Sequence, residues 1–404
     1  MLLRSLRLFV AVSTAAAGFA ISALSQHSPA LSPTNVLVHA SGMRSAVDAH
    51  RSLGTPAVYR NLSIIPVYDD RSRSAGTYIT LDDGLASGTV SVHESKSGGD
   101  VNTLYVTNKG KKPVYLMGGE VVLGGQQDRC LGRDTIVKAK ERDVPVTVFC
   151  VEHGRWAGHT EFAQAAPSLA SADVRSKAQD AEFYGARDAV VGSTGFAGAV
   201  IGGTSSNQIG GRVANTPMQS AVGASSSSRV SKAQQKVWDT VAQKNAKLNT
   251  GSATGTYRVA LTLSGGDAQK SVPGYLKALA GGLGQDPHLV GVVAAINGKV
   301  IAADIFSDPT LFQKLWPKLL RSFAADAVES SSQSPKPIAM VTPVQAKAFL
   351  LASTDVKSRT ENRSDFSTNV RYESINTVTF SLETPQNGAS GGGFGAVHTG
   401  TIVK

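Results

Sequence analysis

The stretch VGVVAAINGKVIAADIF, residues 290–306, consists of two apolar runs separated by Asn297-Gly298. Asn-Gly is the dipeptide that two-residue hairpin turns favour most, because both central residues of such a turn adopt a positive φ angle. The stretch therefore predicts an antiparallel β-hairpin.

A capped helix is predicted upstream of this hairpin. In SKAQQKVWDTVAQKNAKL, residues 231–248, Ser231 is suited to cap the helix, and Gln234 three residues later completes a capping box. Apolar residues then recur at the spacing of one helical face. Between helix and hairpin, YRVALTL, residues 257–263, alternates in polarity like a β-strand.

A second helix is predicted downstream, after Asp308-Pro309. Its apolar face would consist of Leu311, Phe312, Leu315, Trp316, Leu319, Leu320 and Phe323. Pro317 lacks an amide hydrogen and is expected to kink this helix or divide it in two. Residues 231–329 are thus expected to form the α+β half of a main domain.

Residues 57–164 are rich in strand patterns. Runs such as VNTLYVTNKGKKPVYLM, residues 101–117, and VPVTVFCVE, residues 144–152, are β-branched or aromatic and are separated by Gly, Asp, Asn and Lys. They predict an antiparallel, β-rich first half of the main domain. The fold class predicted for the whole chain is α+β.

Two further segments differ in composition from these halves. Residues 165–230 are rich in Ala, Ser and Gly, and they are expected to be a low-complexity insertion or linker because they offer little apolar surface to bury. Residues 330–404 begin with a Ser/Pro-rich linker and contain strand-like runs. They are expected to be a short β-rich C-terminal extension that adds a strand or two to the main sheet.

The first 25 residues have the features of a secretory signal peptide. Arg4 and Arg7 precede the apolar stretch from Leu8 to Ala20, and Ala23-Leu24-Ser25 suits signal peptidase. The apolar stretch is shorter than the ~20 residues that a membrane span needs, which favours cleavage over a retained anchor helix. Residues 26–56 are expected to be a poorly ordered lead-in. The mature chain is therefore expected to be exported, periplasmic or extracellular, without a stable membrane span.

The charge of the chain bears on its partners. The 404 residues carry a formal net charge of +10, which falls to +8 without Arg4 and Arg7. Lys and Arg are dispersed along the sequence, which argues against a nucleic-acid partner. The basic run KGKK, residues 109–112, is interpreted as an ordinary hairpin turn between Asn108 and Pro113. A mildly basic surface favours small anionic ligands or wall polymers, and a protein partner stays unknown.

The sequence contains two cysteines, Cys130 and Cys150. Disulfides are common in exported proteins, and a bridge that closes a loop of about twenty residues contributes ~3 kcal/mol in the chain-entropy model. A Cys130–Cys150 disulfide is therefore predicted, with two buried thiols as the alternative.

Two polar clusters stand at the ends of apolar segments. They are GGEVVLGGQQDRC, residues 118–130, and VFCVEHGRW, residues 148–156, called here the Glu120 segment and the Glu152 segment. Strand alternation places Glu152 on the face of Val148 and Cys150, and it gives Glu120 the parity of other apolar residues, so both carboxylates are expected to lean inward. We expect the two segments to meet around one ligand pocket.

The candidate site comprises the catalytic candidates Glu120 and Glu152 and the ligand-binding candidates Gln127, Arg129, Arg155 and Trp156. Arginines bind phosphate or carboxylate groups, an indole stacks on a ring, and carboxylates bind ribose or act as general acid and base. A structural interpretation stays open, in which these residues form a salt-bridge network that fastens strand ends. The residue types alone do not decide whether the protein is an enzyme.

Metal and cofactor chemistry find little support in the sequence. His153 and His159 lie near Glu152 and Glu161, but their spacing is not that of a metal-binding motif. The sequence lacks a G-x-S-x-G motif, so a serine hydrolase is not indicated. No metal and no cofactor are predicted.

With these residues in view, the chain resembles the domain family associated with ADP-ribosylglycohydrolases and rhodanese-type phosphatases in bacterial gene neighbourhoods. The resemblance runs from about Ala57 to Glu329 and is carried by GEVVLGGQQDR, VFCVEHGRW, SKAQQKVW, GVVAAINGKVIAADIF and LFQKLWPKLL. The chain departs from the family pattern in its Ser/Gly segment, its C-terminal extension and Cys130. The resemblance implies a role connected with ADP-ribose or related nucleotides, without established catalytic residues.

Residues and resemblance together predict an exported ligand-binding domain. Its ligand would be ADP-ribose-like or another anionic sugar, which the protein binds or slowly hydrolyses. The alternative is a non-enzymatic envelope protein whose polar clusters are scaffold.

Overall fold

The computed structural model describes residues 50–72, 77–95, 102–155, 158, 160–194, 222–283, 286–331, 340–364, 366–385 and 394–404. These residues belong to one compact unit. The predicted signal peptide, the lead-in up to residue 49, the middle of the predicted insertion (residues 195–221) and Trp156 lie outside the described residues. Within them, every helix is too short or too polar to cross a membrane.

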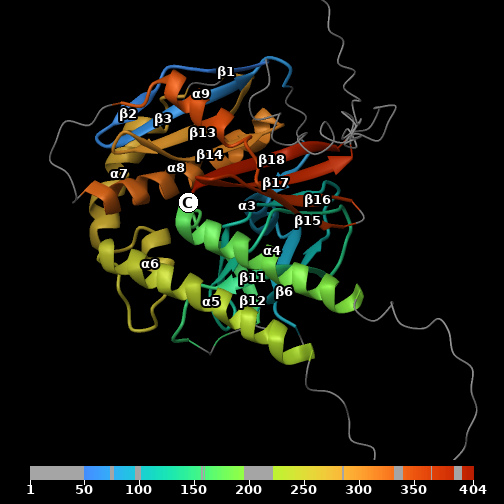
Figure 1. Ribbon diagram of the computed structural model, residues 1–404. Coiled ribbons are helices and arrows are strands. Elements are labelled where there is room, and N and C mark those ends of the chain that lie inside the picture. The colour runs from blue at the N-terminus through green and yellow to red at the C-terminus, as the bar shows by residue number, and fades with distance from the viewer. Residues whose placement is uncertain are drawn as a thin grey trace, which may run out of the picture. The chain divides into compact units, whose positions relative to one another are not determined.

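Runs of strands and runs of helices follow one another along the described chain, with strands at both ends (Figure 1). The strands are β1 (Arg51–Leu53), β2 (Ala57–Tyr59), β3 (Leu62–Asp69), β4 (Ile79–Thr80), β5 (Val90–His93), β6 (Thr103–Asn108), β7 (Val114–Leu116), β8 (Val121–Gly124), β9 (Arg129–Leu131), β10 (Thr135–Val137), β11 (Val144–Cys150), β12 (Glu161–Ala165), β13 (Leu289–Ile296), β14 (Lys299–Phe306), β15 (Ser358–Arg363), β16 (Thr368–Glu373), β17 (Thr377–Pro385) and β18 (Phe394–Val403). The helices are α3 (Leu81–Ala86), α4 (Ala172–Thr194), α5 (Val222–Lys247), α6 (Arg258–Leu261), α7 (Gly266–Leu279), α8 (Pro309–Ser331) and α9 (Pro343–Ala352). The predicted α+β class is confirmed.

A large antiparallel sheet has the strand order β1-β3-β13-β14-β18-β17-β16-β15, with β2 also paired to β3. Its centre contains the predicted hairpin of β13 and β14. Asn297 and Gly298 form the turn, with φ angles of 51° and 74°, as a two-residue hairpin turn requires. The hairpin prediction is confirmed.

The predicted β-rich half folds mainly into a closed barrel with the strand order β11-β6-β5-β12-β8-β9. The same part of the chain also forms a separate, small three-stranded sheet with the order β10-β7-β4, which contains a parallel pair, β4 with β7. Alternate barrel residues such as Val92, Val106 and Val148 are buried in one apolar cluster, which also includes Leu81 of α3. Antiparallel pairing dominates this half, as predicted.

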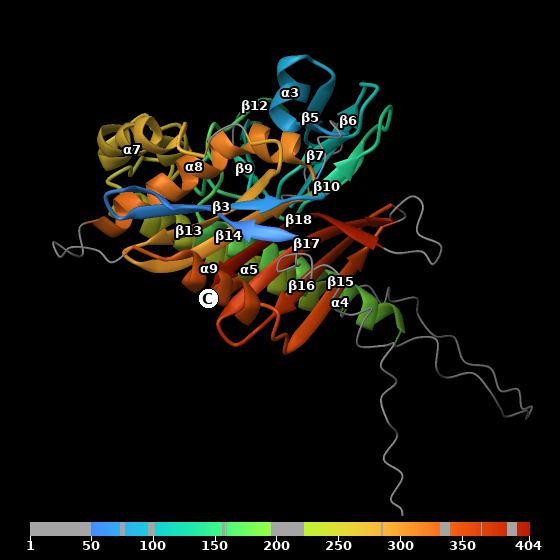
Figure 2. The ribbon, with the colours of Figure 1, turned by 90° about the horizontal axis from the view of Figure 1, so that it is seen from above.

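Helices cover both faces of the large sheet (Figure 2). The seven apolar residues predicted for the face of α8 are all buried in the main core, and the helix is continuous through Pro317. Val292 and Ala294 of β13 belong to that core, whereas Val293 and Ala295 pack in a second cluster with residues of α9. Because neighbouring residues of a strand point to opposite faces, α8 and α9 cover opposite faces of the sheet.

The prediction of an insertion over residues 165–230 is wrong at both ends of that segment. Residues 172–194 form α4, and α5 begins at Val222, before the predicted cap at Ser231. The low-complexity composition of this segment conceals a packed helix. Small side chains let α4 approach its neighbours closely, and Val174 and Ala178 are completely buried. In addition, Lys244 of α5 lies 3.1 Å from Asp173 of α4.

Two other local predictions differ from the structure. The strand predicted over residues 257–263 is the short helix α6. The C-terminal segment, expected to add a strand or two, contributes four strands to the large sheet, and β18 lies between β14 and β17. Pairings between segments so far apart in sequence leave no local pattern.

Candidate functional site

The Glu152 segment and the end of β8 are joined by an ion cluster whose carboxylates are buried and whose arginines are partly exposed. We call it the Asp128 cluster; it comprises Asp128, Glu152, Arg155 and Arg258. The Nε of Arg258 donates to Asp128 Oδ2 at 2.9 Å, and its Nη2 donates to Oδ1 at 2.5 Å. The Nε of Arg155 donates to Glu152 Oε2 at 2.8 Å, and the hydroxyl of Thr254 donates to Glu152 Oε1 at 3.0 Å. Both carboxylates are thus held by cations and hydroxyls.

The structure adds Arg258 to the predicted site. Hydrogen bonding to Asp128 raises the pKa of Arg258, so its charge is secure. Arg258 lies in α6, where the sequence predicts a strand. Its pairing with Asp128 spans 130 positions, and the sequence contains no local signal for it.

Gln127 and Arg129 also bond within the protein. Arg129 Nη1 donates to Gln127 Oε1 at 2.7 Å, and Gln127 Nε2 donates to the carbonyl of Glu152 at 2.9 Å. Arg129 Nη2 lies 3.9 Å from Glu94 Oε1. Burial lowers the pKa of Arg129, although the nearby Cys150 and Glu94 oppose that effect. The side chains of Gln127 and Arg129 therefore bridge strand ends.

Glu120 does not join the Asp128 cluster. Its Oε1 accepts a hydrogen bond from Lys318 Nζ of α8 at 2.7 Å, and its Oε2 accepts one from the amide of Met117 at 2.9 Å. Burial raises the pKa of Glu120, with Lys318 opposing. The length of β8 separates Glu120 from Gly124, about 13 Å at the rise of a β-strand. The structure therefore does not bring Glu120 and Glu152 together around one pocket, and each glutamate has its own set of partners.

The two cysteines correct another prediction, because both are free thiols. Cys130 pairs with Phe149 across β9 and β11, and Cys150 pairs with Arg129. Since directly opposed residues share a face and neighbours alternate, the two side chains point to opposite faces of these strands. A disulfide between them is sterically excluded in this register.

A second buried network crosses the large sheet. We call it the His398 network; it comprises Tyr115, Asp134, Arg175, Asp304 and His398. His398 Nδ1 lies 2.6 Å from Asp134 Oδ2, and its Nε2 lies 3.2 Å from Asp304 Oδ1. Tyr115 donates its hydroxyl hydrogen to Asp134 at 2.8 Å. Each of these side chains is nearly or fully inaccessible to solvent.

Electrostatics favour the charged form of this network. Burial lowers the pKa of His398, but the charge of Asp134 and hydrogen bonds to Asp134 and Asp304 outweigh burial and raise it to about 9. Burial likewise raises the pKa of Asp304, but Arg175 and His398 outweigh it and lower the value to about 2. His398 is thus a cation between two carboxylates at neutral pH.

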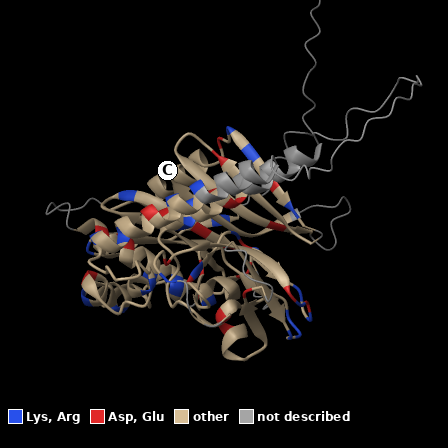
Figure 3. Ribbon diagram, turned by 90° about the horizontal axis from the view of Figure 1, so that it is seen from below, with Lys and Arg blue, Asp and Glu red and all other residues tan. Residues whose placement is uncertain are grey.

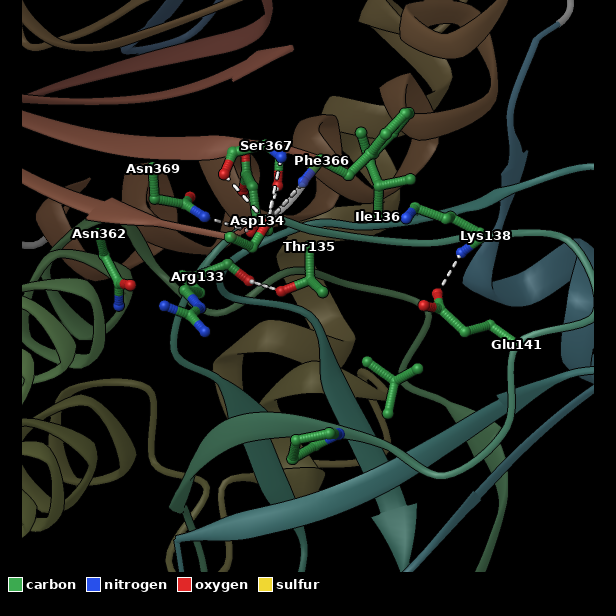
Figure 4. A pocket seen from close by; sticks show the side chains of 13 residues that line it. Arg133, Asp134, Thr135, Ile136, Lys138, Glu141, Asn362, Phe366, Ser367 and Asn369 are labelled. Atoms are coloured by element: carbon green, nitrogen blue, oxygen red, sulfur yellow. Dashed lines mark hydrogen bonds between the residues drawn. The ribbon is translucent and has the colours of Figure 1, made fainter. Parts of the chain in front are cut away.

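A cavity of about 280 Å³ lies beside this network, between β10 and the turn from β15 to β16 (Figure 4). Its polar lining comprises the hydroxyls of Thr135, Ser364 and Ser367, the amides of Asn362 and Asn369, and the charged side chains of Arg133, Lys138 and Glu141. Its apolar lining comprises Ile136, Val144, Pro145 and Phe366. We call it the Phe366 cavity.

Several contacts position the walls of the Phe366 cavity. The Nδ2 of Asn369 donates to the backbone carbonyl of Asp134 at 3.1 Å, which connects β16 to the small sheet. The Nζ of Lys138 lies 5.1 Å from the centre of the Phe366 ring, whose residue is 36% exposed. Arg133 pairs with Glu182 of α4 at 3.0 Å. The cavity thus combines a half-exposed ring, hydroxyls and cations.

Glu120, Gln127, Arg129, Glu152 and Arg155 are not among the residues that line the Phe366 cavity. Sequence reasoning missed the Phe366 cavity because its walls come from residues 133–145 and 362–369. The same ranges of described residues contain no group of three or more His, Cys, Asp or Glu side chains arranged to hold a metal ion.

Comparison with known families agrees with the resemblance seen in the sequence. The model of the ARG and Rhodanese-Phosphatase-superfamily-associated Protein domain matches residues 50–389. Neither a curated protein nor a solved structure matches the chain. The family match includes β15, β16 and β17, so most of the segment predicted as an extension is part of the family domain. The chain belongs to the family of ARG and Rhodanese-Phosphatase-superfamily-associated Protein domains.

Proposed function

We propose that this domain binds a small anionic sugar in the Phe366 cavity. The single observation that carries the proposal is the half-exposed Phe366 ring against the cation of Lys138, in a cavity that hydroxyl and amide groups also line. Aromatic rings stack on flat faces of sugars and bases, and lysine attracts phosphate or carboxylate groups. Ligand sites combine such apolar surface with a few fixed polar groups.

The size of the cavity narrows the ligand. A volume of about 280 Å³ lies just below the range for small-molecule sites, roughly 300–1,000 Å³, so the ligand is expected to be small. A sugar phosphate fits this volume, and so does the terminal ribose phosphate of an ADP-ribose-like ligand. The link of the family to ADP-ribose chemistry, implied by the resemblance, supports the second choice.

The geometry supports binding more than hydrolysis. The hydroxyls of Ser364 and Ser367 lie 3.1 Å apart and bond within their own turn. Glu141 accepts a hydrogen bond from the backbone amide of Lys138 at 2.8 Å. These hydroxyls and this carboxylate already form hydrogen bonds that fix the cavity walls. A general base must be able to reach the proton that it abstracts, so these groups are poorly placed for hydrolysis.

For the Asp128 cluster and Glu120 we propose the structural role that the sequence left open. Their carboxylates are buried and satisfied by cations, amides and hydroxyls, which supports a function in fastening strand ends. Export of the mature chain remains a prediction. Sequencing of the mature N-terminus tests it, with Gln26 as the expected first residue.

Titration calorimetry with ribose 5-phosphate, ADP-ribose, AMP and neutral ribose tests the proposed binding. We expect the wild type to bind at least one phosphorylated ligand and to bind neutral ribose more weakly. Phe366→Ala removes the stacking surface and is expected to weaken binding about tenfold or more, whereas Phe366→Tyr keeps the ring and binds nearly as well. Lys138→Ala is expected to weaken binding of the phosphorylated ligands selectively.

A matched control is Lys236→Ala, which removes an exposed lysine from α5. It is expected to leave every affinity unchanged. The proposal is overturned if the wild type binds none of the four compounds, or if Phe366→Ala binds as the wild type does.

A further inference from the structure

Two loops that lie about thirty residues apart in sequence form one basic surface. We call it the basic tip; it comprises Lys109, Lys111, Lys112, Lys138, Lys140 and Arg142, all of them exposed. The first three follow β6, and the last three follow β10. Figure 3 shows Lys and Arg gathered at neighbouring loop tips at the lower right.

Strand pairing brings the two loops together. The β7–β10 ladder ends at the pair Val114 and Val137, and the β6–β11 ladder ends at the pair Val106 and Val144. Each loop therefore connects a strand of the barrel to a strand of the small sheet at the same end of both ladders. The run KGKK is not the hairpin turn that the sequence suggests, because β6 and β7 pair with other strands.

A buried amide fixes this arrangement. Asn108 is fully buried, and its Nδ2 donates to the carbonyls of Lys112 at 2.9 Å and Lys138 at 3.0 Å. The Nζ of Lys140 donates to the carbonyl of Lys109 at 2.6 Å. The fold thus holds two cationic loops together despite their mutual repulsion.

The two loops of the tip carry an excess of positive charge. Residues 109–112 and 138–143 contain six cations and two carboxylates, a net charge of +4. Glu141 binds a backbone amide, and Asp143 accepts from the Thr107 hydroxyl at 3.0 Å. Among the residues placed by the structure, no carboxylate forms an ion pair with Lys109, Lys111, Lys138, Lys140 or Arg142.

We propose that the basic tip holds the domain against an anionic phospholipid surface. Clustered cations attract a negative membrane surface, and each added Lys or Arg strengthens that attraction. The two loops contain no aromatic residue, whereas nucleic-acid binders combine basic residues with aromatic ones. The export predicted from residues 1–25 would also bring the chain to a membrane. Lys138 belongs to both the basic tip and the Phe366 cavity, so the cavity would then open close to the lipid headgroups.

Sedimentation with phosphatidylcholine vesicles, with and without phosphatidylglycerol, tests the proposal. We expect the wild type to bind vesicles that contain phosphatidylglycerol, and to lose this binding at high salt because the attraction is electrostatic. The variant Lys109→Ala/Lys111→Ala/Lys140→Ala/Arg142→Ala is expected to bind these vesicles at least about tenfold more weakly than the wild type. It retains Lys138, so its affinity for ribose 5-phosphate is expected to equal that of the wild type. That calorimetric measurement separates this proposal from the proposed function.

The matched control removes four exposed lysines elsewhere, by Lys236→Ala/Lys270→Ala/Lys277→Ala/Lys299→Ala. It changes the net charge equally and has the same N-terminal segment, so a difference between the two variants reports the tip alone. Equal loss of vesicle binding in both variants overturns the proposal. Binding of an oligonucleotide without binding of phosphatidylglycerol vesicles also overturns it and assigns the tip to nucleic acid.

Discussion

Arg175 of α4 binds both carboxylate oxygens of Asp304 in β14, its Nη1 and Nη2 lying 2.9 Å and 3.0 Å from Oδ1 and Oδ2. This two-point ion pair attaches the helix to the centre of the large sheet. Both side chains are buried, so each charge is stabilised mainly by its partner and not by water. Breaking such a pair leaves an uncompensated charge in the interior.

Arg175→Met is therefore expected to lower the free energy of unfolding by about 3–5 kcal/mol, because methionine retains much of the volume and removes the charge. Urea denaturation measures the change. The control Arg142→Met, on an exposed loop, is expected to change it by less than about 0.5 kcal/mol. A small effect of Arg175→Met would show that α4 is anchored by other contacts.

The His398 network predicts a dependence of stability on alkaline pH. The pKa of His398 is raised from 6.5 to about 9 in the folded state, so its contribution is fully present below pH 6.5 and is lost as pH rises through 9. The contribution is on the order of 3 kcal/mol. Urea denaturation between pH 6 and about 10 is expected to show this loss.

His398→Gln removes the titrating group and is expected to flatten that profile while lowering stability at neutral pH. The control His50→Gln alters an exposed histidine and should reproduce the wild-type profile. A wild-type stability that stays constant across this pH range would contradict the placement of a charged imidazole between Asp134 and Asp304.

Glu152→Gln distinguishes the two interpretations of the Asp128 cluster. If the cluster is structural, the variant loses about 1–3 kcal/mol of unfolding free energy, because Arg155 loses the charge of Glu152 and keeps only the longer contact with Asp128, at 3.5 Å. Ligand affinity measured by calorimetry is then unchanged. Glu161→Gln, at an exposed position, provides the control. Lost ligand binding with intact stability would return the binding site to the Asp128 cluster.

The free thiols predict the outcome of alkylation. Denatured protein treated with iodoacetamide is expected to gain two adducts by mass, with or without prior reduction. In the native state Cys130 should react slowly, because burial raises its pKa to about 12 and the thiolate is the reactive form. Protein that gains adducts only after reduction would restore the disulfide prediction.

The parts of the fold that the sequence predicts are those with short-range patterns. Asn297-Gly298 predicts its turn because the φ angles it needs depend on two residues. The apolar face of α8 is visible because helical spacing repeats it. In α4, by contrast, the stabilising partners Asp304 and Lys244 lie far away in sequence, and the Ala-rich face looks like low complexity without them.

The candidate site shows the same division. Strand alternation correctly places Glu152 in the interior, and the family resemblance rests on the segment that contains it. Sequence alternation does not reveal that Arg258 satisfies Asp128, or that Lys318 satisfies Glu120, because helices that return to the barrel supply both cations. The Phe366 cavity has walls more than two hundred positions apart.

The place of β18 in the large sheet has a consequence for synthesis. The strand pairs with β14 on one side and β17 on the other, yet its residues, Phe394–Val403, come long after those of β14, Lys299–Phe306, in the sequence. A ribosome adds about 5–20 residues per second, so β14 waits several seconds with an unpaired edge until residues 394–403 emerge. Completion of this sheet is therefore a late step of synthesis, and nascent chains that stall before β18 are expected to depend on chaperones that cover open strand edges.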